Sequence, residues 1–289
     1  MIRYPITATE LEAAIEQEKQ GWLAKAKKKT SAFRRAKQFN EPDSQYSWGE
    51  IKDVFIRLQH NKCAFCDRLL SGPPYGRIEH DLEHFRPKKA VKAWNGNNTY
   101  GYRFALGDAA ERGYYLLAYN IFNYATSCKT CNTKFKANYF PIAGTRRLTT
   151  DDFTLLKQEQ PYLVYPLGNL DDDPETLITY RGILPIPKYR NGHKYRRARI
   201  TIDLFELDSR EDLRRLRAEV IQKLWLAFRT LQQRRSKADA PFARRIIDCA
   251  CSPQTSQVAC SRAFYDLCQN DANTARLFAQ EADEYLCTN

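Results

Sequence analysis

Two Cys-x-x-Cys pairs constrain this chain of 289 residues more than any other feature of its sequence. Cys63 and Cys66 form the first pair, and Cys128 and Cys131 form the second, with the 61 residues 67–127 between them. Zinc takes four tetrahedral ligands, and two such pairs supply four thiolates on two tight turns. The spacing therefore predicts one structural Zn²⁺ per chain. A thiol redox pair is the competing interpretation, but no thioredoxin-like βαβ pattern lies nearby.

The rest of the sequence indicates a soluble cytoplasmic protein. A secreted disulfide scaffold is normally shorter and has an even number of cysteines, whereas this chain has nine. The N-terminus leads into an acidic stretch instead of a signal peptide, and no apolar run reaches the roughly 18 residues that cross a bilayer. We therefore expect reduced thiols and no membrane partner. The five other cysteines are expected to be small buried side chains, at Cys249, Cys251, Cys260, Cys268 and Cys287.

The charge of the chain predicts a polyanionic partner. Lys and Arg number 46 and Asp and Glu number 34, which gives a net charge of +12 at pH 7. Residues 246–289 hold two Arg and six acidic residues, so the rest of the chain carries about +16. Two basic stretches, 19–37 and 186–199, contain no acidic residue. Such a surplus is typical of nucleic-acid binding, although a solvated helix face explains the stretch 19–37 equally well.

Hydrophobic periodicity predicts helices in the N-terminal part of the chain. Residues 8–39 have helical spacing, and Thr9 can cap them. Ser47 begins a second helix through a capping box with Glu50, and we expect that helix to end near His60. Its apolar residues recur at one helical face, which predicts that this face is buried.

The C-terminal half predicts two short strands and one long helix. We expect residues 142–200 to be irregular apart from strands at 162–165 and 176–184. The acidic run 171–173 is expected to form a turn or cap, with metal binding as the lesser alternative. A long helix with an apolar stripe is predicted from about residue 208 onward.

Carboxylate, imidazole and amide side chains follow one another in a characteristic order, from the segment between the cysteine pairs to the residue after the last cysteine. Glu83 and His84 come first, followed by Asn123 and then by Asn132, which directly follows the last cysteine. This set resembles the HNH (ββα-metal) endonucleases in the form whose motif is interleaved with four zinc cysteines. A closer resemblance is to the PtuB-type HNH proteins of Septu and retron anti-phage systems. The segments that carry this resemblance are Cys63–Asp67, Glu83–Lys88, Leu117–Asn123, Ser127–Asn132, Phe140-Pro141 and Tyr165–Pro174.

The resemblance implies an α+β fold built around a zinc-stabilised ββα-metal HNH module. N-terminal and C-terminal helices flank this module, and a short irregular β segment follows it. The predicted parts are an N-terminal helical region (1–62), the HNH nuclease module with the four-cysteine zinc site (63–141), the connecting segment (142–200) and a C-terminal helical region (201–289).

The resemblance also implies the chemistry, which is hydrolysis of phosphodiester bonds in nucleic acid. His84 would be the general base, and Asn123 would hold its ring through a hydrogen bond. Glu83 and Asn132 offer hard oxygen ligands to one Mg²⁺ or Mn²⁺, while the zinc is purely structural. Many relatives have Asp in place of Glu83 and His in place of Asn132, and both departures favour a hard ion over a second Zn²⁺.

A second carboxylate–histidine pair stands four residues upstream, at Glu79 and His80. In a strand His80 and His84 would point to the same face, so His80 could support the site or contact substrate. We prefer Glu83 and His84, because Phe-Arg-Pro-Lys follows them as in the family. The nearby basic side chains are expected to contact phosphates without reading bases, and they are Arg86, Lys88, Lys134 and Lys136.

The resemblance further implies a partner, an ABC-type ATPase like PtuA. The apolar helix over 209–235 or the acidic segment 246–289 would be the docking surface. DNA is favoured over RNA as substrate, although no base-reading element separates the two. The alternative function is a non-catalytic zinc module that binds nucleic acid or a protein, for which the His84, Asn123 and Asn132 set would be unnecessary. A thiol redox enzyme is a third and weaker interpretation.

Overall fold

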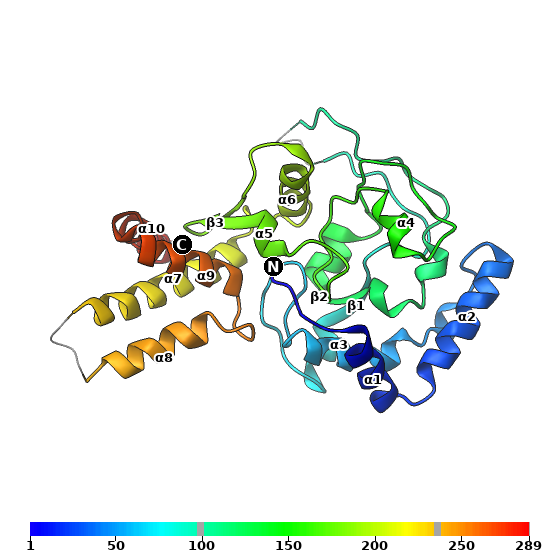
Figure 1. The fold of residues 1–289 in the computed structure, drawn as a ribbon, viewed down its shortest axis with the longest axis horizontal. Helices are drawn as coiled ribbons and strands as arrows, with labels where there is room; N and C mark the ends of the chain where they lie inside the picture. Colours follow the sequence, from blue (N-terminus) through cyan, green and yellow to red (C-terminus); the bar gives the residue numbers. More distant parts are fainter. Residues whose placement is uncertain (97–100, 234–237, 289) are drawn as a thin grey trace.

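The computed structural model of the chain describes residues 1–96, 101–233 and 238–288. The fold is α+β, as predicted, with mostly helices and two small antiparallel sheets (Figure 1). The helices and strands are α1 (Ala8–Glu18), α2 (Trp22–Ala36), α3 (Lys52–Leu58), β1 (His80–His84), β2 (Tyr124–Cys128), η6 (Thr130–Lys136), α4 (Phe153–Lys157), α5 (Pro174–Leu177), β3 (Ile178–Arg181), β4 (Leu184–Pro187), α6 (Gly192–Leu204), α7 (Glu211–Gln232), α8 (Ala240–Ala250), α9 (Val258–Asn270) and α10 (Ala272–Thr288). Short 3₁₀ turns connect them at η1 (Asp43–Gln45), η2 (Trp48–Ile51), η3 (Tyr75–Ile78), η4 (Tyr115–Leu117) and η5 (Ile121–Asn123).

The helix predicted over 8–39 is two helices in the structure. Gly21 has φ +78°, a left-handed conformation that suits glycine, and it separates α1 from α2. The cap predicted at Thr9 is wrong, because Thr7 and Glu10 form the capping box of α1. The capping box predicted at Ser47 is also absent. The chain makes the 3₁₀ turn η2 there before α3 begins, and the Ser47 hydroxyl has no hydrogen-bond partner.

The central sheet joins β1 and β2 in antiparallel register, from His80 opposite Cys128 to His84 opposite Tyr124. Helix α3 packs against both strands, and the short π-type helix η6 follows β2 almost at once. This order places the second cysteine pair at the end of β2 and in the first turn of η6. It also places Glu83 and His84 on β1, Asn123 at the end of η5 just before β2, and Asn132 on η6.

The connecting segment differs in part from its prediction. The strand expected at 162–165 is wrong: these residues are buried but irregular, because a short apolar run indicates burial more surely than it indicates a strand. The single strand expected at 176–184 contains β3 and a turn, and its last residue begins β4, which pairs with β3. Asp173 caps α5, and Arg197 on the unpredicted helix α6 pairs with Asp171 and Asp172. The acidic run therefore forms a cap and ion pairs.

Two clusters of buried apolar side chains hold the chain together. The larger cluster draws residues from the N-terminus through α6 and reaches the start of α7 and of α9, so the boundaries predicted at 62 and 141 do not separate two cores. The smaller cluster lies among α7, α8, α9 and α10, which are grouped at one side of the molecule (Figure 1). The apolar stripe predicted for the long helix faces this cluster or the start of the larger one.

The C-terminal predictions extend slightly beyond the described residues. The stretch 209–235 ends in residues that the structure does not describe, and so does 246–289. Of the five cysteines outside the two pairs, Cys260 and Cys268 are buried, whereas Cys249 and Cys287 are exposed, so the expectation of burial holds for only some of them. No described helix is long and apolar enough to cross a membrane.

Candidate functional site

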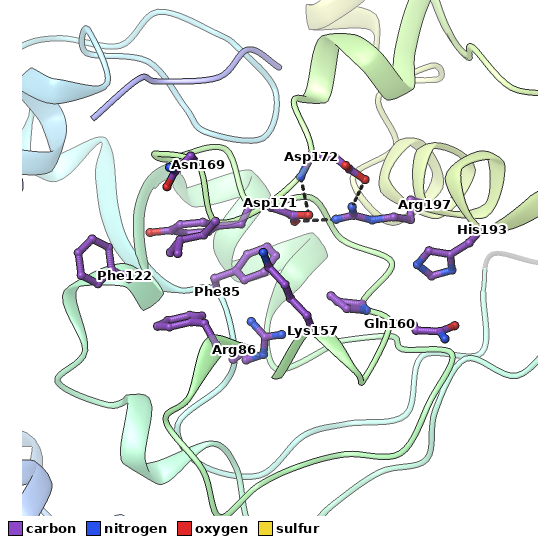
Figure 2. A pocket seen from close by; sticks show the side chains of 14 residues that line it. Phe85, Arg86, Phe122, Lys157, Gln160, Asn169, Asp171, Asp172, His193 and Arg197 are labelled. Carbon is purple, nitrogen blue, oxygen red and sulfur yellow. Dashed lines mark hydrogen bonds and ion pairs between the residues drawn. The ribbon is translucent and has the colours of Figure 1, made fainter. Parts of the chain in front are cut away.

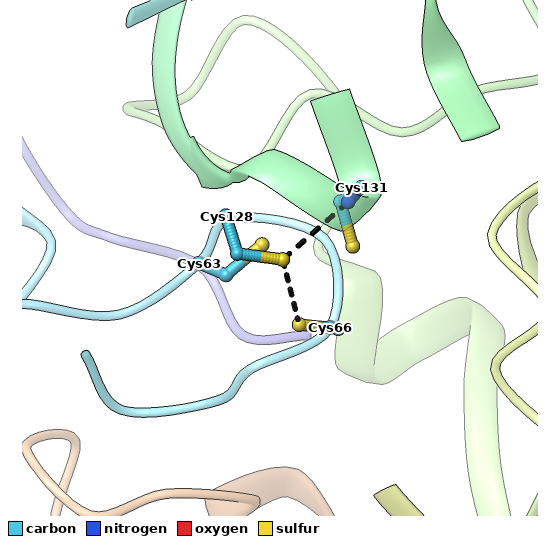
Figure 3. Close-up of side chains that lie close together, drawn as sticks. All are labelled: Cys63, Cys66, Cys128 and Cys131. Carbon is cyan, nitrogen blue, oxygen red and sulfur yellow. Dashed lines mark hydrogen bonds between the residues drawn. The ribbon is translucent and has the colours of Figure 1, made fainter. Parts of the chain in front are cut away.

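The four cysteines of the two pairs meet at one buried point (Figure 3). Their sulfur atoms all lie within 4.8 Å of one another, and Cys66 Sγ is 3.8 Å from Cys128 Sγ. Tetrahedral zinc with Zn–S bonds of about 2.3 Å places its sulfur ligands about 3.8 Å apart, so the cluster fits a zinc site. Among the described residues no other group of three or more His, Cys, Asp or Glu side chains is gathered closely enough to hold a metal.

The surroundings of the cluster suit bound thiolates. Burial raises the pKa of the Cys63 and Cys131 thiols, so they need a cation to lose their protons together. The Cys131 N–H lies 3.4 Å from Cys128 Sγ, and the Arg210 guanidinium donates to Cys131 Sγ at 3.3 Å. Arg210 immediately precedes α7, so the start of this helix contacts the cysteine cluster directly. Such contacts beyond the ligands orient them and partly neutralise their charge.

Strand β1 presents two carboxylates to the same face, because alternate residues of a strand share a face. Asp81 accepts hydrogen bonds from Asn132 Nδ2 at 3.1 Å and from Lys129 Nζ at 3.0 Å. Glu83 is buried, and its Oε1 lies 2.5 Å from Lys136 Nζ. Burial raises the pKa of the Glu83 carboxyl, and the charge of Lys136 counteracts that effect. The site therefore gathers oxygen donors from β1 and from η6.

His84 ends β1 as a buried ring with one defined hydrogen bond. Its Nε2 lies 3.0 Å from the carbonyl oxygen of Ala118. A carbonyl can only accept, so Nε2 carries the proton and the Nδ1 lone pair of the neutral ring is left to accept one. Burial lowers the pKa of His84 well below its ordinary value, and the positive charge of Lys88 lowers it further. The ring also makes edge contacts with Trp48 and Tyr124, at centroid distances of 4.9 and 5.0 Å.

The predicted hydrogen bond between Asn123 and the His84 ring is wrong. The Asn123 side chain accepts from the backbone N–H of Arg86 at 2.8 Å, and it donates to the carbonyls of Arg86 and Leu117. These bonds tie the segment that follows His84 to the segment that carries the Ala118 carbonyl. Asn123 thus does not contact the His84 ring. It holds the backbone next to Ala118, whose carbonyl accepts from His84 Nε2.

Two of the four predicted phosphate contacts are internal. Arg86 is 5% exposed, and it pairs with Glu159 and lies over the Phe140 ring. Its side chain lines a pocket of about 370 Å³ that neither Glu83 nor His84 lines (Figure 2). Lys136 is fully buried between Glu83 and the His84 carbonyl oxygen. Both side chains are almost wholly buried in internal ion pairs, which does not favour the predicted phosphate contacts of Arg86 and Lys136.

The other two predicted phosphate contacts are accessible. Lys134 is exposed on η6, with its ammonium 4.9 Å from the centre of the Phe135 ring. Lys88 is half-buried, and its ammonium lies 4.6 Å from the Trp48 ring centre. Both positions leave the predicted role as phosphate contacts open.

The surroundings of His80 indicate a role in the fold and not in a substrate site. The residue is fully buried, its Nε2 lies 3.1 Å from the Ser71 carbonyl, and its Nδ1 has no partner. In an extended strand four residues span about 13 Å, so His80 is distant from His84. The expectation that His80 could contact substrate is therefore corrected. Glu79, its sequence neighbour, is exposed and accepts from Ser71.

Several residues of the site were missed by sequence reasoning. Asp81 could have been found, because strand alternation from Glu83 puts it on the same face. The Ala118 carbonyl could not, since a backbone acceptor leaves no signal in side-chain identity. Trp48 and Arg210 come from distant segments, and only the tertiary fold brings them to His84 and Cys131.

Two lysines on η6 give a matched test of burial. Lys136→Met should lower the free energy of unfolding by roughly 3–5 kcal/mol, because Glu83 would remain buried without its partner. Lys134→Met should change that free energy by no more than about 0.5 kcal/mol, because Lys134 is exposed. Urea unfolding of both variants measures the difference. Equal stability of the two would contradict the buried pair.

These features define an α+β protein with a four-cysteine cluster that fits a zinc site, and with a strand, paired with the cysteine-bearing strand β2, that carries a buried histidine and two carboxylates. The chain is similar to Septu protein PtuB of Bacillus mycoides (strain KBAB4), with 29% identity over 203 residues. The match covers 70% of this chain and 60% of that protein. It confirms the resemblance to PtuB-type proteins drawn from the sequence. No family model matches the chain. No solved structure matches it with statistical significance.

Proposed function

We propose that this chain is a metal-dependent HNH endonuclease that hydrolyses phosphodiester bonds of nucleic acid, with DNA favoured over RNA. The observation that carries the proposal is the environment of His84. This ring is held by a backbone carbonyl and kept neutral by burial, and it directly follows the buried carboxylate of Glu83 on β1. The strand pair β1–β2 and the helix η6 also follow the order of a ββα module around the cysteine cluster.

In the proposed reaction His84 acts as the general base. The Ala118 carbonyl holds the Nε2 proton, so Nδ1 is the atom that takes a proton from the attacking water. Because the pKa of His84 is lowered, the ring is in its basic form at neutral pH. Asn123 keeps the Ala118 segment in place through its bonds to Arg86 and Leu117. Asn123 is thus a positioning residue in this proposal.

The oxygen donors on β1 and η6 suit a hard cation. Glu83 and Asn132 would hold the proposed Mg²⁺ or Mn²⁺, and Asp81 adds a third donor on the same face. The bond from Asn132 Nδ2 to Asp81 leaves the amide oxygen of Asn132 as its ligand atom. A bound cation would neutralise charge that develops on the phosphate and the leaving oxygen. Lys136 holds Glu83 from the protein side, which fixes the direction of the carboxylate.

The proposed biological role is that of a nuclease effector in anti-phage defence. It rests on the similarity to Septu protein PtuB and on the family resemblance, which implies an ABC-type ATPase as partner. The helices α7 to α10 offer a docking region, because they are grouped away from β1 and carry most of the acidic C-terminal segment. Arg210 would connect such a docking region to the zinc cluster. We place the protein in the cytoplasm on the same grounds.

One observation favours a second function, a non-catalytic zinc module that binds nucleic acid or a protein. The Glu83 carboxylate is already paired with Lys136, as a purely structural ion pair would be. Under this alternative His84 and Glu83 only stabilise the fold. The two functions differ in one result, which is whether the chain breaks phosphodiester bonds.

The direct experiment is a cleavage assay with purified, zinc-loaded protein. DNA and RNA substrates are incubated with Mg²⁺ or Mn²⁺ or without added metal, and with and without the ATPase partner. We expect cleavage of DNA that requires one of these ions. Binding without cleavage under every one of these conditions would support the alternative instead.

A further inference from the structure

An aromatic patch lies directly beside His84. We define the aromatic patch as Phe39, Tyr46 and Trp48, which are all half-buried. The Tyr46 and Trp48 ring centres are 4.0 Å apart, and Phe39 lies 5.8 Å from Tyr46 and 6.3 Å from Trp48. Trp48 then contacts the His84 ring at 4.9 Å. One continuous group of rings therefore leads from the surface to the proposed general base.

Lysines from a distant segment cover this patch. The Lys88 ammonium lies 4.6 Å from the Trp48 ring centre and 5.6 Å from that of Tyr46. The Lys89 ammonium lies 5.8 Å from the Phe39 ring centre, and Lys89 is exposed. About 40 to 50 residues separate these lysines from the rings in sequence, so the fold has brought cations and aromatic faces together.

The patch continues into the basic helix α2. Phe33 on α2 packs against Phe39 at 5.0 Å, which joins the helix to the patch. Helix α2 contains no acidic residue. The basic side chains that this helix and the residue after it expose are Lys25, Lys27, Lys28, Arg34, Arg35 and Lys37. The basic stretch 19–37 thus leads toward the proposed active centre.

Half-exposed rings beside lysines have a specific partner chemistry. A nucleobase stacks on an aromatic ring while the adjacent phosphate meets a cation, and this pairing is how proteins bind single strands. Bases inside a duplex already stack on each other, so only unpaired bases are available to such rings. A surface that binds only the phosphates of a duplex needs lysines but does not need aromatic rings at the surface.

We propose that the aromatic patch, with Lys88 and Lys89, binds unpaired nucleotides. Single-stranded nucleic acid, or a single-stranded segment of a larger molecule, is then the substrate class delivered to His84. That His84 cleaves the bound strand rests on the proposed nuclease function, whereas the binding of unpaired nucleotides by the patch does not. DNA and RNA strands share this chemistry, and the experiment distinguishes them.

The experiment measures binding of end-labelled oligonucleotides by fluorescence anisotropy at one fixed salt concentration. Zinc-loaded protein without added Mg²⁺ or Mn²⁺ is titrated into oligo-dT, into oligo-U and into a DNA duplex of equal length. We expect both single strands to bind more tightly than the duplex, and the tighter of the two identifies the strand chemistry. Trp48→Leu should weaken single-strand binding at least about fivefold, while Trp48→Phe retains most of it.

The chain provides a matched control in Trp225 on α7. Trp225 is also half-buried, and the Arg229 guanidinium lies 5.7 Å from its ring centre. Trp225→Leu should leave the affinity for oligo-dT unchanged. Tyr46→Leu serves as a second patch variant if Trp48→Leu loses its zinc or its cooperative unfolding.

Two results would overturn this inference. One is duplex binding as tight as single-strand binding, and the other is wild-type affinity in the folded Trp48→Leu and Tyr46→Leu variants. Failure of the proposed nuclease function has a different signature, which is Trp48-dependent binding of single strands without cleavage in Mg²⁺ or Mn²⁺. If the Trp48→Leu and Tyr46→Leu variants cleave at the wild-type rate, the nuclease proposal stands and the proposed role of the aromatic patch is wrong.

Discussion

Replacement of His84 by alanine should slow cleavage by about 100- to 10,000-fold, the usual contribution of a general base. The ring's Nε2 is held by the Ala118 carbonyl, so no other nitrogen of this residue can take the proton in place of Nδ1. The measurement is the single-turnover rate of cleavage in Mg²⁺ or Mn²⁺, with zinc content and thermal unfolding recorded for the same samples.

A control separates loss of the base from loss of structure. His193 lies outside the site, next to Tyr162, so His193→Ala should cleave at the wild-type rate. Added imidazole should restore part of the activity of His84→Ala, because a small base can enter the space of the missing ring. His84→Ala that cleaves as fast as wild type would show that the base is misassigned.

Loss of the zinc should unfold the part of the chain around β1, β2 and η6. Structural zinc sites contribute about 10–16 kcal/mol of apparent binding free energy. A domain's whole stability is about 5–15 kcal/mol. Cys128→Ser removes one of four converging thiols, so we expect a zinc content well below one per chain and loss of cooperative unfolding.

Cys249 gives the matched control, because it is an exposed cysteine on α8, far along the chain from the cluster. Cys249→Ser should keep one zinc per chain and the wild-type melting temperature. Metal analysis and calorimetry of the two variants make the comparison. A zinc-free Cys128→Ser protein that melts like wild type would contradict a structural role for the metal.

The parts of the fold that the sequence predicts are those set by local rules. Within each cysteine pair the two-residue spacing holds the sulfurs close, and the two pairs meet in one cluster as predicted. The long apolar stripe correctly predicted α7. The errors arise where tertiary packing decides. Gly21 interrupts a pattern that is otherwise helical, and the run 162–165 is buried without pairing as a strand. Helix α6 was not predicted, because residues 142–200 were expected to be irregular; in the structure Arg197 on α6 is buried against two aspartates.

The candidate site divides in the same way. The family resemblance pointed to Glu83, His84 and Asn132, and the fold places them on β1 and η6. Charge alone could not tell which basic side chains face solvent. Lys134 and Lys136 look alike in sequence, yet the turn of η6 exposes one and buries the other against Glu83. Whether these residues catalyse a reaction stays a proposal.

The most direct test of the central claim is the rate of cleavage as the concentration of Mg²⁺ is raised, for zinc-loaded wild type and for Glu83→Gln. The account predicts no wild-type cleavage without an added divalent ion and a rate that rises to saturation. The Glu83→Gln protein, with equal zinc content, should need much more Mg²⁺ because it has lost a charged oxygen ligand. Cleavage without added metal, or the same Mg²⁺ dependence in both proteins, would contradict the account.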